Sequence, residues 1–505
     1  MSSGGMKMDT IWNLLERNTR NFPQSTAVRY PAKNQSLTWI ELRNTALDLA
    51  NHLNARGVRQ GDRVAFLFHN CPEFACAFYA IAYLGAVVVP INMKLTAPEI
   101  NYILQNSEAT ALLFTEDKRE TAEAATKGTG VKTLLSGVEF PSHGAGMAGY
   151  VESGYAAGTD LAEILYTSGT TGRPKGVMLS HYAIISAGQM MAYESQIYHQ
   201  DNVLLLMPLT HSAPLNLYLV GACWAGAQVT LGEFAPQTLA DMVVKERISH
   251  FFGAPVAYQL LLRIPNIGNY DLSSMKCWIY GGAPTGREQI LAWQKVLPGN
   301  FMSVYGLTEA GPNGLALRHA EHAMKAGSIG GRGAINVEVK VVRPDGTEAD
   351  AGEAGEIALK APSMMLGYYK NPQATEEVLR DGWLLTGDVA TRDEDGYIWI
   401  LDRKKDMIIS GGVNIYPKEI EDLLMTHPRI IDVAVIGVPH PDWGESVCAV
   451  LTVNEGEDLT LEDVKEFCRG KLADYKIPKL VTITPALPRN SSGKLLKYLL
   501  RKEVS

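Results

Sequence analysis

Between residues 38 and 114 helical and strand patterns alternate, and this alternation constrains the fold more than any other feature of the sequence. Thr38 and Glu41 have the spacing of a capping box, apolar residues follow at helical period, and Gly57 occupies a C-terminal cap position. Buried strands are predicted at 64–68, 86–90 and 111–114, and helices at 74–83 and from Thr96. Strands that alternate with helices favour an α/β fold with doubly wound sheet over a helical bundle.

The size and charge of the chain set the next limits. Its 505 residues are too many for one hydrophobic core and suggest roughly three domains or large subdomains. The 46 basic and 54 acidic residues give a net charge of −8, which offers no general footprint for nucleic acid. A polyanionic ligand would therefore have to be bound by local groups.

The cysteines and the hydropathy pattern bear on the compartment. The six cysteines have neither C-x-x-C spacing nor a Cys/His ligand pattern, so we expect reduced core residues in a cytoplasmic protein. No run of about eighteen apolar residues predicts a membrane span. Residues 1–5 lack the basic and apolar regions of a signal peptide.

Later segments continue the α/β pattern. Residues 118–158 lose periodicity and are interpreted as a surface connection, and strands are predicted at 202–207 and 227–231. Residues 251–255 and 278–284 each predict a strand that ends in a sharp turn. In open α/β sheets ligands bind beyond the carboxyl ends of strands, so these turns are candidate pocket walls, with ordinary strand exits as the alternative.

The C-terminal third has a different organisation. Short β runs split by Asp-Gly turns predict a β-rich part at about 327–401, which closes an N-terminal domain of residues 1–401. A charged cluster then marks a boundary, and residues 402–505 form a small α+β domain. Within it we predict helices at 417–425 and 461–472 and strands at 433–438 and 447–453.

The segment 166–176, YTSGTTGRPKG, has the composition of a phosphate-binding loop. Its glycines let backbone N–H groups approach an anion, its hydroxyls add donors, and Lys175 adds a positive charge. It is not a Walker loop, because Gly176 follows the lysine where Ser or Thr is required. Apolar runs at 161–165 and 177–179 place the loop between strands, which argues against the alternative of a flexible linker.

Four further clusters have similar character. In YGLTE, Tyr305 offers a face for adenine, Thr308 a hydroxyl for phosphate, and Glu309 a carboxylate for Mg²⁺, although a solvated strand end is the alternative. In Thr386-Gly387-Asp388, the carboxylate suits the two hydroxyls of a ribose, although turn aspartates are common. The remaining two clusters are 402–412, DRKKDMIISGG, and 490–494, NSSGK, whose alternatives are a charged linker and a solvated terminus.

Together these motifs resemble the adenylate-forming superfamily of acyl-CoA synthetases, aryl-acid ligases, adenylation domains and luciferases. The resemblance covers nearly the whole chain, up to Lys494. It implies that ATP and a carboxylic acid form an acyl-adenylate and pyrophosphate, after which the acyl group passes to a thiol. It also implies a large N-terminal domain and a small mobile C-terminal domain, with Asp402 matching the hinge.

The resemblance implies a role for each matching residue. Lys494 would bridge the acid and the α-phosphate, Glu309 would bind Mg²⁺, and His211 would gate the acid carboxylate, although a lone histidine is more often structural. The ATP phosphates would be held by Thr308 and by Thr167, Ser168, Gly169, Thr170, Thr171, Gly172 and Lys175. Adenine would lie against Gly282, Ala283, Pro284, Tyr305 and Gly306, and ribose against Asp388 and Arg403. The pantetheine thiol of CoA would pass Gly411 and Gly412, flanked by Ser410 and Val413.

The acid itself is predicted from its candidate pocket, which contains only uncharged residues besides His211: Tyr258, Gly281, Gly306, Ala310, Gly311 and Pro312. An uncharged tail is favoured, with a medium- or long-chain fatty acid first and a hydroxycinnamate or benzoate as the alternative. Gly411-Gly412 resembles bacterial fatty-acyl ligases more than plant hydroxycinnamate ligases, which usually have Lys-Gly there, although some bacterial aryl-acid ligases share it.

The first functional hypothesis is therefore an acid–CoA ligase that uses ATP, Mg²⁺ and CoA, as a monomer or homodimer. The chain ends eleven residues after Lys494, so we expect no fused carrier domain. A separate enzyme that loads a carrier protein is the second hypothesis, and a luciferase-type oxygenase is the third. A nucleotide-binding regulator without catalysis is disfavoured by the intact motifs. Peripheral membrane contact is compatible with a lipid substrate, but nothing in the sequence requires it.

Overall fold

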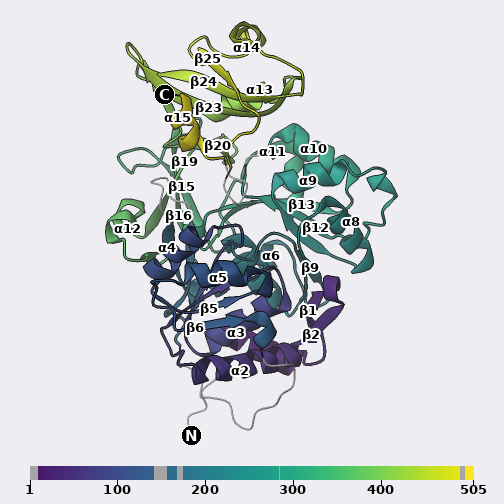
Figure 1. Ribbon diagram of the computed structural model, residues 1–505. Helices are drawn as coiled ribbons and strands as arrows, with labels where there is room; N and C mark the ends of the chain where they lie inside the picture. The colour runs from purple at the N-terminus through teal and green to yellow at the C-terminus, as the bar shows by residue number, and fades with distance from the viewer. Residues whose placement is uncertain (1–8, 141–155, 168–173, 284, 490–494, 505) are drawn as a thin grey trace. The chain divides into compact units, whose positions relative to one another are not determined.

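The computed structural model describes residues 9–140, 156–167, 174–283, 285–489 and 495–504 (Figure 1). The chain divides into two compact units, Met1–Val339 with Leu359–Leu384, and Lys340–Ala358 with Leu385–Ser505. Each unit has hydrophobic core clusters of its own. The domain boundary and hinge at Asp402 stay predictions.

The first unit contains a seven-stranded sheet, in the order β17-β8-β7-β4-β3-β5-β6. Its strands are β3 (Arg63–Leu67), β4 (Val87–Pro90), β5 (Ala109–Phe114), β6 (Thr133–Ser136), β7 (Leu161–Thr167), β8 (Lys175–Ser180) and β17 (Gly367–Tyr368). The pairings from β7 to β6 are parallel, whereas β8 runs antiparallel to both of its neighbours. Helices α3 (Pro72–Tyr83), α4 (Ala97–Ser107) and α5 (Arg119–Ala125) pack against β4 and β5 (Figure 1).

An eight-stranded sheet follows the order β14-β13-β12-β11-β9-β10-β1-β2. Its strands are β1 (Thr26–Tyr30), β2 (Gln35–Thr38), β9 (Asn202–Leu205), β10 (Gln228–Leu231), β11 (His250–Gly253), β12 (Cys277–Gly281), β13 (Asn300–Gly306) and β14 (Gly314–Leu317). Strands β11, β12 and β13 are parallel neighbours, so their carboxyl ends share one edge. The doubly wound α/β class is confirmed.

Further helices cover and connect the two sheets of this unit. They are α1 (Ile11–Asn21), α2 (Trp39–Ala55), α6 (His181–Glu194), α7 (Val220–Ala225), α8 (Pro236–Lys245), α9 (Pro255–Leu262), α10 (Arg287–Val296), α11 (His322–Lys325) and α12 (Pro372–Val378). The predicted start of α2 is confirmed, because Glu41 Oε2 accepts from Thr38 N at 2.8 Å while Thr38 Oγ1 accepts from Glu41 N at 3.3 Å. Gly57 ends this helix in the left-handed region, with φ +93°.

A β-rich part and an α+β C-terminal part are both present, while the bounds given for them stay predictions. One sheet has the order β15-β16-β19-β18 with β20 on β19, and another has the order β22-β21-β24-β23 with β25 on β24. The strands are β15 (Glu338–Val342), β16 (Ala354–Lys360), β18 (Leu379–Arg380), β19 (Trp383–Arg392), β20 (Ile398–Arg403), β21 (Ile408–Ser410), β22 (Val413–Ile415), β23 (Ile430–His440), β24 (Gly444–Val453) and β25 (Leu480–Ile483). The C-terminal helices are α13 (Pro417–Leu424), α14 (Leu461–Cys468) and α15 (Lys497–Val504).

Two predictions of local structure need correction. The segment 118–158 is not only a surface connection, because α5 and β6 lie within it and β6 pairs in parallel with β5. Residues 141–155 of that segment lie outside the described residues. The helix predicted to reach residue 472 ends at Cys468, and Gly470 then adopts φ +72°, which interrupts a right-handed helix.

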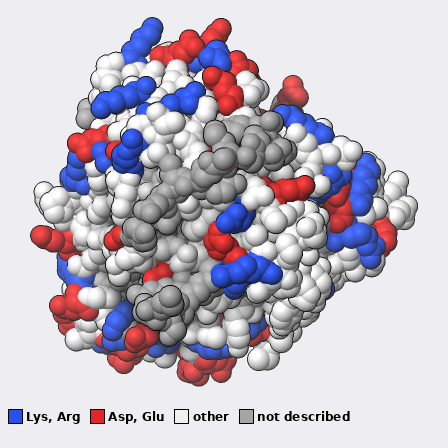
Figure 2. Space-filling model, turned by 90° about the horizontal axis from the view of Figure 1, so that it is seen from below, with Lys and Arg blue, Asp and Glu red and all other residues white. Residues whose placement is uncertain are grey.

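Surface charge and hydropathy agree with the composition. On the face in Figure 2, acidic and basic side chains are interspersed, with no large area of one sign outside the grey residues. No helix among the described residues combines the length and the apolar character needed to cross a bilayer.

Candidate functional site

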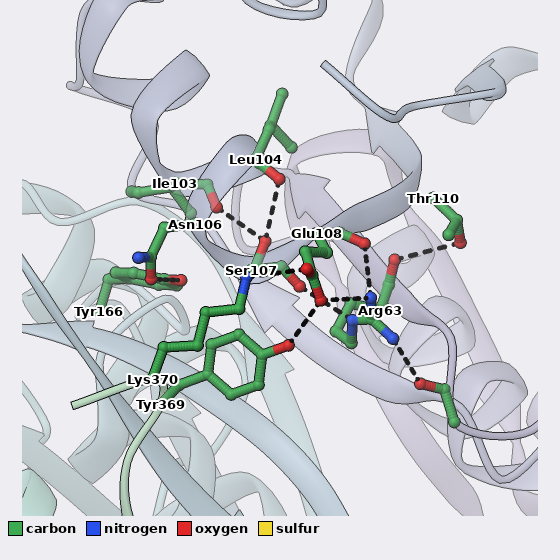
Figure 3. Close-up of polar contacts among 11 residues, drawn as sticks. Arg63, Ile103, Leu104, Asn106, Ser107, Glu108, Thr110, Tyr166, Tyr369 and Lys370 are labelled. Carbon is green, nitrogen blue, oxygen red and sulfur yellow. Dashed lines mark hydrogen bonds and ion pairs between the residues drawn. The ribbon is translucent and has the colours of Figure 1, made fainter. Parts of the chain in front are cut away.

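Strands β7 and β8 hold both ends of the candidate phosphate loop. Thr167 pairs with Lys175 across the two strands, so the chain leaves the sheet and re-enters it at one point. Beside the loop, Tyr166 donates to Asn106 Oδ1 at 2.7 Å (Figure 3), and Tyr102 donates to the Pro174 carbonyl at 3.4 Å. Ser168, Gly169, Thr170, Thr171 and Gly172 lie outside the described residues.

A charged cluster at the end of α4 holds residues 369–370 next to the β7–β8 hairpin. Glu108, in the left-handed region at φ +56°, accepts from Tyr369 OH at 3.0 Å and pairs with Lys370 Nζ at 2.9 Å and Arg63 Nη2 at 3.3 Å (Figure 3). The hydrogen bonds from Lys370 and Tyr369, with the Lys370 charge, hold the pKa of the Glu108 carboxyl below its usual value. The cluster anchors residues 369–370 to α4.

The segment 363–370 joins the candidate magnesium ligand to the loop strand. The backbone N–H of Met365 donates to the Glu309 carbonyl at 2.9 Å, and that of Tyr369 donates to the Gly176 carbonyl at 2.7 Å. Tyr368 OH donates to Glu309 Oε1 at 2.8 Å, and Lys175 Nζ lies 4.7 Å from the centre of the Tyr368 ring. Tyr368 therefore contacts both Lys175 and Glu309, which the sequence places far apart.

Thr308 and Glu309 lie in a short 3₁₀ turn, η6 (Thr308–Ala310), directly after β13. Thr308 Oγ1 lies 2.9 Å from Ser212 Oγ, so these hydroxyls share a hydrogen bond. A Cβ on Gly306 would lie 1.9 Å from the Pro312 carbonyl oxygen, and one on Gly311 would lie 2.0 Å from that of Ser363. Only glycine fits this tight backbone, which presents Thr308 and Glu309 together.

His211 precedes Ser212 and lies partly buried beside Asn92. Its Nε2 is 3.4 Å from Asn92 Nδ2. Burial, with the nearby charge of Lys94, lowers the pKa of His211 below its ordinary value, so the imidazole is neutral at pH 7. A neutral imidazole at this place can orient a carboxylate through one hydrogen bond.

The candidate adenine wall is formed at the shared edge of β12 and β13. Gly281 ends β12 and pairs with Val304, and Gly282 follows with φ +81°. Tyr305 is partly exposed on β13, one residue before the exposed Gly306. Ala283 is exposed, and Pro284 lies outside the described residues. Tyr258 is different, because it is fully buried in the core and donates to the Ile279 carbonyl at 2.6 Å, so it does not line a pocket.

In the second unit, Asp388 and Arg403 face each other across the β19–β20 pair. Arg403 Nε lies 2.7 Å from Asp388 Oδ1, and its Nη1 donates to the Thr386 carbonyl at 3.2 Å. Asp388 is buried, so Arg403 offsets the cost of burying its charge. The pair presents a fixed carboxylate and guanidinium at one place.

Asp402 binds the backbone on both sides of the candidate hinge. Its Oδ1 accepts from Arg403 N at 2.7 Å, and its Oδ2 accepts from Lys418 N at 2.8 Å at the start of α13. Burial raises the pKa of the Asp402 carboxyl, while the charge of Lys497 and these two hydrogen bonds oppose the shift.

The two glycines of the candidate thiol channel form the turn between β21 and β22. Gly411 has φ +57° and Gly412 has φ +81°. Gly411 N donates to the Trp443 carbonyl at 2.8 Å, and a Cβ on Gly411 would lie 2.7 Å from the Trp443 ring. A Cβ on Gly412 would meet no atom within 4 Å.

These geometries predict different costs for two alanine substitutions. Gly412→Ala should lose about 1 kcal/mol of unfolding free energy, because alanine is strained at positive φ. Gly411→Ala should lose about 1 kcal/mol more, since its methyl group must also displace Trp443. Urea denaturation measures both, and equal losses in the two variants would contradict the predicted contact.

The described residues thus join part of the predicted site. Lys175, Thr308, Glu309 and His211 lie in the first unit. Tyr368 contacts both Lys175 and Glu309, Ser212 joins the His211 segment to Thr308, and Asn92 lies beside His211. The sequence did not single out any of these three connecting residues. The second unit contains Asp388, Arg403, Gly411 and Gly412, whereas Lys494 lies outside the described residues. No cluster of three or more His, Cys, Asp or Glu side chains suited to a metal ion occurs within the described ranges. A lone Glu309 fits Mg²⁺ that is held mainly by phosphates and water.

Comparison with known proteins gives consistent results. The chain matches the family described as AMP-binding enzyme over residues 15–369 and the AMP-binding enzyme C-terminal domain over residues 419–494. It is 39% identical over 493 residues to feruloyl-CoA synthase of Amycolatopsis sp, covering 96% of this chain and 97% of that protein. It is 34% identical over 501 residues to the long-chain-fatty-acid–CoA ligase FadD13 of Mycobacterium tuberculosis, covering 98% of both. The crystal structure of ATP-bound MatB from Rhodopseudomonas palustris superposes with a TM-score of 0.88 at 31% identity, covering 97% of this chain and 98% of that one.

Proposed function

The chain belongs to the family of AMP-binding enzymes, and on this premise we propose that it activates a monocarboxylic acid with an uncharged tail. It is an AMP-forming acid–CoA ligase that uses ATP, Mg²⁺ and CoA. An acyl-adenylate and pyrophosphate form first, and the acyl group then passes to the thiol. A medium- or long-chain fatty acid is the first candidate substrate.

The observation that carries this choice is the lack of charged residues on the helical segment after His211, and among the described residues Lys94 is the one charge that acts on the imidazole. Seven residues of a π-helix, η4 (Ala213–Leu219), directly follow His211 and Ser212, and none of them is charged. Gly281-Gly282 at the end of β12 and Gly306-Leu307 at the end of β13 carry no charge either, and Glu309 beyond them is assigned to Mg²⁺. A second carboxylate or an amine on the acid would have no partner of opposite charge on these elements, which supports an uncharged tail.

The adenylation step requires positive charge and alignment more than proton transfer, because the acid carboxylate and the α-phosphate repel each other. We assign the phosphates to Thr167, Lys175 and Thr308, and Mg²⁺ to Glu309. Tyr368 holds one Glu309 oxygen by its hydrogen bond, while Oε2 accepts no hydrogen bond from any residue that the structure describes. Bound Mg²⁺ would neutralise charge on the phosphate oxygens.

The remaining roles are proposed from matching residues. Gly282, Ala283, Tyr305 and Gly306 would contact adenine, and the Asp388–Arg403 pair would bind ribose. Lys494 would bridge the acid and the α-phosphate. The Gly411-Gly412 turn would contact the pantetheine arm. The Trp443 ring packs directly against the first of these glycines.

An aryl acid is the second candidate. Tyr218 stacks on Phe252 with ring centres 4.8 Å apart, and its buried hydroxyl has no hydrogen-bond partner among the described residues. A hydroxylated aromatic acid that reached this 0% exposed side chain would supply the missing hydrogen-bond partner, and the name of the 39% identical feruloyl-CoA synthase points to the same class.

One kinetic panel separates the two candidates. The panel measures pyrophosphate release for a series of saturated fatty acids of increasing length, for hydroxycinnamates and for benzoates. We expect the fatty acids to release pyrophosphate, and their kcat/KM with CoA as acceptor should exceed the kcat/KM of the aryl acids. Tyr218→Phe should change kcat/KM for a fatty acid by less than about twofold, whereas loss of a hydrogen bond to a hydroxylated aryl substrate would cost about tenfold. If no acid of either class released pyrophosphate, the ligase function would be refuted. A separate assay with a carrier protein in place of CoA would identify the thiol acceptor.

We also propose a cytoplasmic location. All six cysteines are free and buried, which supports a reducing compartment. The oligomeric state, monomer or homodimer, stays a prediction that light scattering of the purified protein would test.

A further inference from the structure

Strand β7 carries a carboxyl group inside the core, four residues before Thr167. Glu163 is 0% exposed and lies between Val88 of β4 and Leu179 of β8. Its register with β8 is interrupted by an irregularity between Leu161 and Glu163. An ionised carboxylate in such a place is costly unless a cation or several donors surround it.

The only hydrogen bond to this carboxyl from the described residues comes from Asn216 of η4. Asn216 Nδ2 donates to Glu163 Oε2 at 2.8 Å. Glu163 Oε1 and Asn216 Oδ1 are both buried, and neither has a hydrogen-bond partner among the described residues. Two buried acceptors in one pair therefore lack a donor.

A proton on Glu163 removes this conflict. A protonated carboxyl has one O–H donor. Asn216 Oδ1, the acceptor in the same pair, has no other donor among the described residues and can accept from it. Protonation also removes the buried charge. Burial raises the pKa of Glu163 to about 8, against the opposing effect of the Asn216 hydrogen bond. At pH 7 the neutral acid is therefore the major form.

The pair connects two parts of the candidate site. Strand β7 leads into the phosphate loop at Thr167, whereas η4 begins directly after His211 and Ser212. Leu215 N in η4 donates to the His211 carbonyl at 3.3 Å, and Ser212 shares its hydrogen bond with Thr308. A shift of η4 along β7 would therefore move His211 and Ser212 relative to Lys175.

We propose that Glu163 is a positioning residue, which as a neutral acid holds η4 on β7 and so aligns the His211 side of the site with the phosphate loop. Glu163 does not touch the substrate in this proposal and acts through Asn216. The inference rests on the proposed function in assigning the acid carboxylate to His211. The wide turns of π-helices are frequent at functional sites, which agrees with this role for η4.

Three variants test the proposal in the full-length enzyme. Glu163→Gln keeps the shape and supplies an N–H donor, so kcat/KM for the acid should stay within about twofold. Glu163→Leu removes both hydrogen bonds and should raise KM for the acid and lower kcat, each by about tenfold, because small misalignments near reacting groups are costly. KM for ATP should change by less than about threefold, since the phosphate groups are unaltered.

Ile164→Val is the matched control, a buried change at the next position of β7 that should leave kcat/KM unchanged. The proposal is overturned if Glu163→Leu keeps kcat/KM for the acid within about threefold, or if Glu163→Gln is as impaired as Glu163→Leu.

Infrared spectroscopy tests the protonated carboxyl without substrate. The difference spectrum of the wild type and Glu163→Gln at pH 7 should contain the carbonyl band of a protonated carboxylic acid, and the Ile164→Val difference should lack it. A difference spectrum without this band would overturn the proposal. The infrared measurement does not need Glu163→Leu, so it tests the proposal even if that variant fails to fold. Because no acid is added, the result is distinct from failure of the proposed ligase function.

Discussion

Replacing Lys494 with alanine should lower the rate of adenylation by about 10²–10³-fold, the usual effect of removing a group that stabilises charge in the transition state. The reason is electrostatic. The acid carboxylate and the α-phosphate are both anionic, and Lys494 is the cation that the proposed function places between them. Pyrophosphate release with saturating ATP and acid measures this step.

The second half-reaction should survive in the same variant. Thioester formation from preformed acyl-adenylate and CoA should stay within about threefold of the wild type, because it no longer requires the two anions to approach. Lys502→Ala is the matched control, since Lys502 is an exposed lysine of the same C-terminal segment. Equal damage to both half-reactions by Lys494→Ala would rule out the alternation of the C-terminal domain between two steps.

Glu309→Gln should lower kcat/KM for pyrophosphate release by about 10²-fold and raise the Mg²⁺ concentration needed for half-maximal rate by about tenfold. An amide oxygen can still accept the hydrogen bond of Tyr368, so the local geometry should persist. What is lost is the negative charge that Mg²⁺ prefers among its ligands. Initial rates over a Mg²⁺ series at fixed ATP measure the change.

Tyr368→Phe separates positioning from charge at the same place. This variant keeps the Glu309 carboxylate but removes its hydrogen bond at Oε1, and it leaves an aromatic face for Lys175. We expect a loss of about three- to tenfold in kcat/KM with a smaller change in Mg²⁺ dependence. If Glu309→Gln showed an unaltered Mg²⁺ dependence, Glu309 would not be the metal ligand.

Local patterns predicted the framework of the fold well. The capping-box spacing at Thr38 and the helix start predicted at Thr96 correctly located α2 and α4, and both helices have capping boxes in the structure, because the signal and the structure lie within four residues. Strands with a sharp turn were also predicted within 251–255 and 278–284, and the structure ends them at Gly253 and Gly281. Their parallel pairing brings the following turns to one edge. These features depend on short stretches of sequence.

The contacts within the site depend on long separations and could not be predicted in this way. Tyr368 lies 59 positions from Glu309, and Ser212 lies 96 positions from Thr308. Neither residue belongs to a motif that suggests a ligand. The Gly367–Tyr368 strand is only two residues long, so no alternation marks it as part of the sheet.

Tyr258 shows the opposite error. It was predicted to line the acid pocket, whereas its side chain lies in a core with Trp293, with ring centres 4.8 Å apart. Which face of α9 is buried depends on the neighbouring helix α10, and that packing is not visible in the local sequence.

The buried Glu163 makes folding of this chain a proton-consuming process at neutral pH. In the unfolded chain its carboxyl titrates near the ordinary 4.5, whereas burial raises the pKa in the folded chain to about 8. Between these values the folded state binds the additional proton, so this group makes the folded state less stable as pH rises, by at most about 1.4 kcal/mol per pH unit. Below pH 4.5 the penalty is absent. The contact that holds η4 on β7 therefore costs folding stability, and this cost increases as the pH rises from 4.5 to about 8.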